Sequence, residues 1–243
     1  MFAFIRATRK RAFIWARTEA RRIWLRGDRV HCPICGGAFR RFIHYEGGTQ
    51  NRCPRCFSRS RHRLMFLYMA SQTDLLSRGD VLHFAAEPGL ERHFRARSHG
   101  RYVTADLRND VDVRADLTRL PFAPDSFDAV ICSHILEHVP NDHAALRELF
   151  RVLRAGGRAM ILVPLDPDRE RTVEDPSATG PRERRERFGQ SDHVRMYGTD
   201  FPARLSSAGF EVKEVKAADL ADAKTIARYD LDEFDIVFIC TKP

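Results

Sequence analysis

The chain carries two closely spaced pairs of cysteines near its N-terminus. Cys32 and Cys35 form one C-x-x-C pair, and Cys53 and Cys56 form a second pair after a gap of 17 residues. Four thiolates satisfy the tetrahedral preference of Zn²⁺ and leave no open coordination position, so this spacing predicts a structural zinc module over residues 30–60. A redox dithiol is the alternative for a single pair, but two matched pairs favour a metal.

The other residues that could bind a metal near this module are two histidines. His31 and His44 could each replace a sulfur ligand, although four sulfurs suffice. The remaining cysteines, Cys132 and Cys240, stand alone in apolar runs, where we expect small buried side chains. This cysteine usage is typical of a reducing compartment, and we expect a cytoplasmic protein.

Short apolar runs alternate with helical patterns from residue 79 onward. Four runs cover residues 81–85, 102–105, 128–132 and 159–163, and two further strands are expected over 211–215 and 235–240. This alternation predicts an α/β domain over residues 61–243, in which a parallel sheet is covered by helices on both faces. A stretch rich in Arg, Glu, Pro and Asp interrupts the pattern and predicts a charged lid or insertion at about 166–198.

The positive charge is concentrated at the front of the chain. Residues 1–72 hold 16 Lys and Arg against 3 Asp and Glu, whereas the remainder holds 25 against 30. Residues 1–29 mix apolar and basic side chains at helical spacing and predict a basic amphipathic helix. This helix could contact the inner face of a membrane or a nucleic acid, or pack on the protein itself or a second copy. No run is long and apolar enough to span a membrane.

Over residues 81–243 the sequence resembles class I methyltransferases of the small-domain, methyltransferase type 11-like kind. The resemblance is carried, in order, by VLHFAAEPGL, YVTADL and VRADLTRLPFAPDSFDAVICSHILEHVPNDHAALRELFRVLRAGGRAMILVP. It implies a Rossmann-like sheet of seven mostly parallel strands and S-adenosyl-L-methionine as the methyl donor. The whole chain, with its zinc-ribbon-like module in front, is similar to bacterial proteins that carry a methyltransferase domain.

The resemblance also implies a set of donor-binding residues. Asp106 would accept hydrogen bonds from both ribose hydroxyls of the donor, and Asp116, with the amide of Leu117, would read the adenine edge. Ser133 and His134 would lie beneath the methionine part. The predicted set is Ala85, Glu87, Gly89, Asp106, Leu107, Asp116, Leu117, Ser133 and His134.

The loop after the first strand of this domain departs from the family pattern. The family commonly has an acidic residue and three spaced glycines there, whereas this chain has His83, Ala85, Glu87 and only Gly89. Glu87 could compensate by binding the cationic amino group of the donor. Alternatively, the loop binds no donor and the chain is a catalytically inactive scaffold.

Methyl transfer requires an aligned acceptor, exclusion of water and, for some acceptors, a base. His193 is the leading candidate base because the ordinary pKa of histidine lies near neutral pH, and His138 and Tyr197 are further candidates. We expect a small-molecule acceptor, or a glycan-like or lipid-linked one. The alternative acceptor is RNA held by the basic zinc module, as in a ribosomal RNA guanine methyltransferase that joins a four-ligand zinc finger to this fold.

Overall fold

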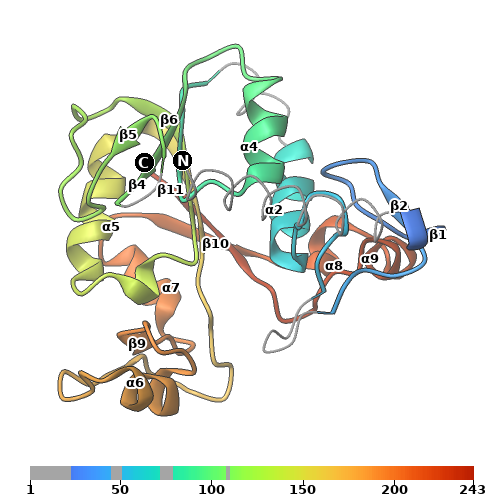
Figure 1. Cartoon of the computed structure of the whole chain (residues 1–243). Helices are drawn as coiled ribbons and strands as arrows, with labels where there is room; N and C mark the ends of the chain where they lie inside the picture. The colour runs from blue at the N-terminus through green and yellow to red at the C-terminus, as the bar shows by residue number, and fades with distance from the viewer. Residues whose placement is uncertain (1–22, 45–50, 72–78, 108–109) are drawn as a thin grey trace, which may run out of the picture. The chain divides into compact units, whose positions relative to one another are not determined.

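The computed structural model describes residues 23–44, 51–71, 79–107 and 110–243 (Figure 1). Residues 1–22 of the predicted N-terminal helix lie outside this part of the chain. The chain divides into two compact units that are interleaved in sequence. The first unit comprises Met1–Ala70, Glu87–His93 and Lys216–Asp235, and the second comprises Ser71–Ala86, Phe94–Val215 and Ile236–Pro243. The units therefore divide the chain differently from the predicted ranges, since two later segments join the first unit.

The first unit contains a short hairpin and several helices. Strand β1 (Arg26–His31) pairs antiparallel with β2 (Ala38–Phe39), so residues 26–29, the end of the range predicted as a helix, form a strand instead. The helices are α2 (Ser60–Ser71), α8 (Ala217–Leu220), α9 (Ala223–Tyr229) and most of α4 (Pro88–Arg95).

A buried arginine ties the late segment of the first unit to the early one. Arg63 is fully buried, and its guanidinium donates to the carbonyl oxygens of Ser58, Tyr229 and Asp230 at 2.9, 2.6 and 2.6 Å. A buried guanidinium is tolerated only when its donors are satisfied. Residues near 230 therefore complete the environment of α2.

In the described part of the chain, the second unit is built on a seven-stranded sheet in the order β10-β11-β7-β6-β3-β4-β5. Strand β3 pairs in parallel with both β4 and β6, and β6 pairs in parallel with β7. Strand β11 runs antiparallel between β7 and β10. The predicted α/β fold with a mostly parallel sheet is thus confirmed. The strands are β3 (Val81–Phe84), β4 (Tyr102–Asp106), β5 (Val113–Arg114), β6 (Phe127–Ser133), β7 (Leu153–Leu162), β10 (Glu211–Val215) and β11 (Val237–Thr241).

The central strands are buried because both of their faces are covered. All four residues of β3 are buried, which explains why its sequence does not alternate between apolar and exposed polar residues; its one polar residue, His83, is buried as well. Helix α5 (Asp142–Val152) adds Ala145, Leu146 and Leu149 to the same hydrophobic core. Strand β7 follows this helix without a loop, beginning directly at Leu153.

The charged segment expected to form a lid has secondary structure of its own. Strand β8 (Val173–Glu174) pairs antiparallel with β9 (Arg195–Met196), and α6 (Pro181–Phe188) lies between them in sequence. Phe188 is fully buried, so the segment has an apolar anchor. The remaining elements are η1 (Leu136–His138) and α7 (Phe201–Ser206). Among the described residues, no helix is sufficiently long and apolar to cross a bilayer.

Candidate functional site

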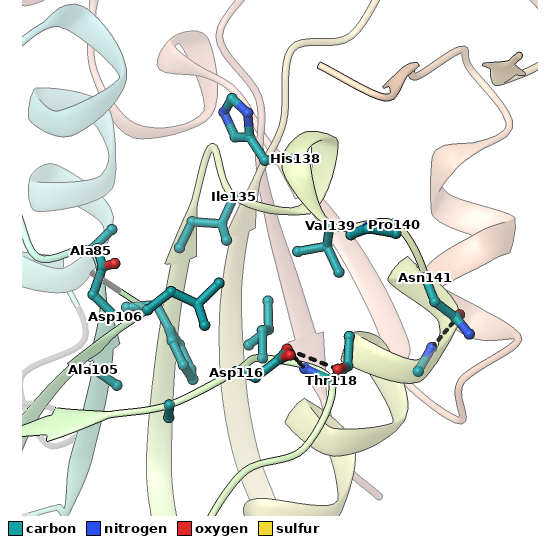
Figure 2. Close-up of a pocket in the computed structure, with 15 residues that line it drawn as sticks. Ala85, Ala105, Asp106, Asp116, Thr118, Ile135, His138, Val139, Pro140 and Asn141 are labelled. Carbon is teal, nitrogen blue, oxygen red and sulfur yellow. Dashed lines mark hydrogen bonds between the residues drawn. The ribbon is translucent and has the colours of Figure 1, made fainter. Parts of the chain in front are cut away.

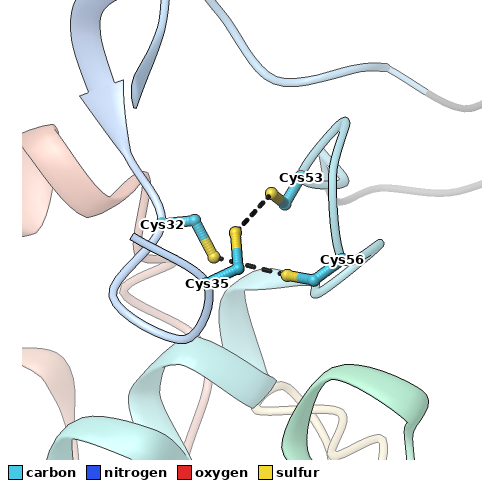
Figure 3. Close-up of side chains that lie close together, drawn as sticks. All are labelled: Cys32, Cys35, Cys53 and Cys56. Atoms are coloured by element: carbon cyan, nitrogen blue, oxygen red, sulfur yellow. Dashed lines mark hydrogen bonds between the residues drawn. The ribbon is translucent and has the colours of Figure 1, made fainter. Parts of the chain in front are cut away.

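The four predicted cysteines come together in the first unit (Figure 3). The sulfur of Cys32 lies 3.5 Å from that of Cys56, and the sulfur of Cys35 lies 3.6 Å from that of Cys53. Four sulfurs bound to Zn²⁺ at about 2.3 Å in a tetrahedron would be about 3.8 Å apart. The cluster therefore matches the donor set and the dimensions of a structural zinc site.

The two C-x-x-C segments each form the same pattern of backbone hydrogen bonds. The amide of Cys32 donates to the carbonyl of Gly37, and the amide of Cys53 donates to the carbonyl of Ser58, both at 2.9 Å. The amides of Gly36 and Phe57 donate back to the carbonyls of the first cysteine in each pair. Two equivalent turns thus present two sulfurs each to one point.

Two of the predicted donor-loop residues belong to this first unit. A carboxylate oxygen of Glu87 lies 3.1 Å from Nε2 of His62. A Cβ atom at Gly89 would lie 3.2 Å from Cβ of Cys56 and 3.3 Å from its carbonyl oxygen. The absence of a side chain at Gly89 is therefore explained by packing against the second cysteine turn.

The second unit has a cavity of about 450 Å³ at the carboxyl ends of its parallel strands (Figure 2). This is where α/β sheets bind ligands, because neighbouring loops separate at the point where the strand order reverses. Its wall is mostly apolar and comes from the ends of β3, β4, β5 and β6 and from the start of α5. The lining residues are Phe84, Ala85, Ala105, Asp106, Leu107, Ala115, Asp116, Leu117, Thr118, Ile135, His138, Val139, Pro140, Asn141 and Ala144.

Five predicted donor residues line this cavity: Ala85, Asp106, Leu107, Asp116 and Leu117. Asp106 is the last residue of β4, and its backbone carbonyl accepts from the amide of Ala115 at 3.0 Å. Asp116 accepts from both the amide and the hydroxyl of Thr118 at 2.8 Å, which fixes its carboxylate (Figure 2). The carboxylates of Asp106 and Asp116 therefore follow neighbouring strands and line the same cavity.

Ser133 and His134 follow the same strand edge but do not line the cavity. Ser133 ends β6, and its buried hydroxyl oxygen has no hydrogen-bond partner among the described residues. His134 has a positive φ of 54°, and its Nδ1 lies 3.1 Å from a carboxylate oxygen of Glu137. Their predicted role beneath the methionine part of the donor stays a prediction.

Tyr197 takes part in a buried network rather than in the cavity wall. Its hydroxyl donates to Asp142 at 2.8 Å, and Arg204 approaches the same carboxylate at 2.7 Å. Burial raises the pKa of Tyr197 far above its ordinary value. For Asp142, burial would raise the pKa, but the hydrogen bond from Arg204 and the charge of Arg195 outweigh it and hold the pKa below 3.8.

The predicted bases His138 and His193 lie together although they are distant in sequence. Their rings are 4.9 Å apart and roughly perpendicular. His138 lines the cavity, whereas His193 is buried behind that wall and burial lowers its pKa below 6.5. A buried carboxylate, Glu137, offers a ligand atom within 4.8 Å of one from each histidine. Glu137 was not among the predicted site residues, although its place between a strand end and His138 was a signal in the sequence.

The second unit has a Rossmann-like α/β fold with a cavity at the carboxyl ends of its parallel strands. Residues 73–161 match the family model described as a methyltransferase domain. A chain of the complex between the Haloferax volcanii Trm112 methyltransferase activator and a methyltransferase has a similar fold, with a TM-score of 0.54 and 18% identity over 75% of this chain and 91% of that one. Residues 73–161 therefore resemble a methyltransferase domain, and the solved structure shares the fold of this chain.

The chain also matches enzymes of quinone biosynthesis over part of their length. Demethylmenaquinone methyltransferase of Mycobacterium tuberculosis is 47% identical over 64 residues, which are 26% of this chain and 27% of that protein. The ubiquinone/menaquinone biosynthesis C-methyltransferase of Rhizobium meliloti is 34% identical over 122 residues, 50% of this chain and 40% of that protein. The chain thus spans about a quarter of the length of the first curated relatives it matches.

Proposed function

We propose that this protein transfers the methyl group of S-adenosylmethionine to a small, ring-bearing acceptor. The observation that carries the proposal is the placement of Asp106 and Asp116 around one cavity at the carboxyl ends of β4 and β5. The cavity volume of about 450 Å³ suits a ligand of nucleoside size. The likeness to enzymes of quinone biosynthesis supports a ring-bearing acceptor.

Each part of the cavity suits one part of the donor. The Asp106 carboxylate can accept two hydrogen bonds from the ribose hydroxyls. Asp116 and the Leu117 amide offer an acceptor and a donor to the adenine edge, while apolar wall residues such as Ile135 would contact the ring. The donor supplies a methyl carbon bonded to a sulfonium sulfur, which an aligned nucleophile displaces in line. His138 lines the cavity, where its side chain could orient the attacking atom of the acceptor.

The proposed role of the four-cysteine cluster is structural. Zinc bound by four thiolates has no open position for a substrate, and its binding free energy stabilises a segment that has few apolar residues of its own. The expected result of metal analysis is zinc that is retained on dialysis and lost from a Cys53→Ser variant.

Calorimetric titration with S-adenosylmethionine and S-adenosylhomocysteine tests the donor site. We expect micromolar binding by the wild-type chain and at least a tenfold loss in Asp106→Ala, because about 1.4 kcal/mol of lost hydrogen bonding corresponds to that factor. Asp110→Ala is the matched control, since Asp110 is exposed and does not line the cavity. Absence of binding by folded, zinc-loaded protein would refute the enzyme and leave the inactive scaffold.

An acceptor screen with radiolabelled donor follows once binding is established. Quinols and related hydroxylated rings are the first acceptors to test. Methylation of RNA, with a binding constant that falls steeply with salt, would instead support the alternative acceptor class.

A further inference from the structure

We propose that Glu137, His138 and His193 form a second metal site, which binds a first-row divalent cation beside the cavity. One carboxylate and two imidazoles are a common ligand set for Zn²⁺ and other transition metals in proteins. The ligand atoms of the three side chains lie within 4.8 Å of one another. The site is separate from the four-cysteine cluster, which belongs to the other unit.

The carboxylate at this site has a buried oxygen that remains to be satisfied. Glu137 is 1% exposed. One of its carboxylate oxygens lies 3.1 Å from Nδ1 of His134, and the other has no hydrogen-bond partner among the described residues. Leaving a buried carboxylate oxygen unpaired is costly, and a cation removes that cost directly.

Both histidines are oriented through the same ring nitrogen. Nδ1 of His193 lies 3.1 Å from the carbonyl oxygen of Phe188, and Nδ1 of His138 lies 3.2 Å from the carbonyl oxygen of Asp192. A carbonyl partner requires the hydrogen on Nδ1, so Nε2 of each neutral ring keeps its lone pair. Metal-binding histidines are usually held in this way by a carbonyl or carboxylate behind them.

The three side chains must close slightly around an ion. Ligand atoms bound at about 2.1 Å in a tetrahedron are about 3.4 Å apart, so a separation of 4.8 Å would shrink by about 1.4 Å. Small side-chain rotations of His138 supply such a movement, since this ring is only partly buried. The segments that carry the ligands, η1 and the stretch before β9, are already joined by the hydrogen bond from the Val194 amide to the Glu137 carbonyl.

Three protein ligands leave one position open on a tetrahedral ion, as in catalytic zinc sites. Because His138 also lines the cavity, the open position would be available to an acceptor bound there. A metal lowers the pKa of a hydroxyl that it binds, so the site favours acceptors with a hydroxyl group on the ring. This last step rests on the proposed function, whereas metal binding itself does not.

Cobalt titration of the full chain tests the site. Zinc-loaded protein is first treated with dipicolinic acid, which withdraws metal from open sites while the four-cysteine site keeps its zinc. Added Co²⁺ should then give visible d–d absorption without thiolate charge-transfer bands, with micromolar affinity or better. Glu137→Gln, which can still accept the hydrogen bond from His134, should weaken this binding by about 100-fold or more, beyond the usual cost of losing an outer partner.

Matched controls come from exposed residues of the same types. Glu186 on α6 and His143 on α5 are exposed, and neither belongs to the cluster. Glu186→Gln and His143→Gln should bind Co²⁺ like the wild type. His193→Gln, checked for folding by circular dichroism, provides a second loss-of-ligand variant if Glu137→Gln fails to fold.

Three outcomes would overturn the proposal: no d–d absorption, binding only at millimolar Co²⁺, or unchanged binding in both ligand variants. Any of them would leave Glu137 and His193 as a metal-free buried pair. Failure here is distinguishable from failure of the proposed function, because donor binding is measured separately by calorimetry and depends on Asp106.

Discussion

Gly36 and Phe57 occupy the same position in the two cysteine turns, and both adopt the left-handed backbone conformation, with φ of 67° and 60°. Each follows the second cysteine of its pair, and each donates its amide to the carbonyl of the first. Glycine accepts this conformation without strain, whereas a residue with a Cβ pays about 1–2 kcal/mol. The second turn is therefore strained where the first is not.

Exchanging these residue types should shift stability in opposite directions. We expect Phe57→Gly to raise the free energy of unfolding by about 0.5–1 kcal/mol, since the Phe57 side chain is half exposed and loses little packing. Gly36→Ala should lower it by about 1 kcal/mol, although no atom lies within 4 Å of the added Cβ. Thermal melting of the zinc-loaded protein checks both, and a melting temperature lowered by Phe57→Gly would contradict the strain argument.

Gly89→Ala should destabilise the first unit despite the higher helix propensity of alanine. The added Cβ would press on both Cβ and the carbonyl oxygen of Cys56, which the sulfur cluster holds in place. We expect a loss of about 1 kcal/mol and faster release of zinc to a chelator. Gly180→Ala is the control, because its Cβ would lie at an ordinary 3.5 Å from a flexible Glu183 side chain. Equal zinc release from both variants would show that the contact has no effect.

The buried carboxylate of Asp142 should make stability depend on acidic pH. Its pKa is lower in the folded chain than its ordinary value of 3.8, so the ionised form stabilises the fold above about pH 4. That contribution is lost as the pH falls through the folded pKa. We expect Asp142→Asn to cost about 3 kcal/mol at neutral pH, and urea unfolding should show this difference shrinking below about pH 4. Glu174→Gln, at the exposed rim of the same network, should cost much less.

Ala85 places a methyl group where the methyltransferase pattern usually has glycine. It lines the cavity and has a positive φ of 46°. Ala85→Gly should bind S-adenosylmethionine equally or more tightly, because the cavity wall recedes and the strain disappears. Ala85→Val should weaken binding by about tenfold or more, since a β-branched side chain tolerates this conformation poorly. Calorimetry measures both, and tight binding by Ala85→Val would place the donor away from this wall.

The sheet could be predicted because each strand can be recognised from a short stretch of its own sequence. Strands β3 and β6 are mostly apolar and buried, and Asp106 directly ends a strand, so the cavity edge follows from parallel topology. The cysteine cluster could be predicted for the same reason, since the four cysteines lie within 25 residues of one another. These features depend on neighbours in sequence.

Other features depend on pairings that no local pattern encodes. Gly89 was assigned to the donor by its position after β3, but its contact with Cys56 reflects packing of segments that are far apart. His193 lies near Glu137 and His138 because β9 packs against η1. This contact could not be predicted, since the segment before β9 has no apolar periodicity. The early end of the N-terminal helical pattern at β1 likewise depends on pairing with β2.

The hydrogen bonds of Arg63 determine when the first unit can complete its folding during synthesis. The cysteine segment leaves the ribosome early, but the carbonyl groups of Tyr229 and Asp230 that satisfy the Arg63 guanidinium emerge about 165 residues later. Until then the Arg63 guanidinium has only the Ser58 carbonyl and lacks its other two carbonyl acceptors, so the nascent module stays incomplete and hydrated. Chains stalled before Tyr229 should therefore be more sensitive to proteolysis around α2 than released chains, whatever their metal content.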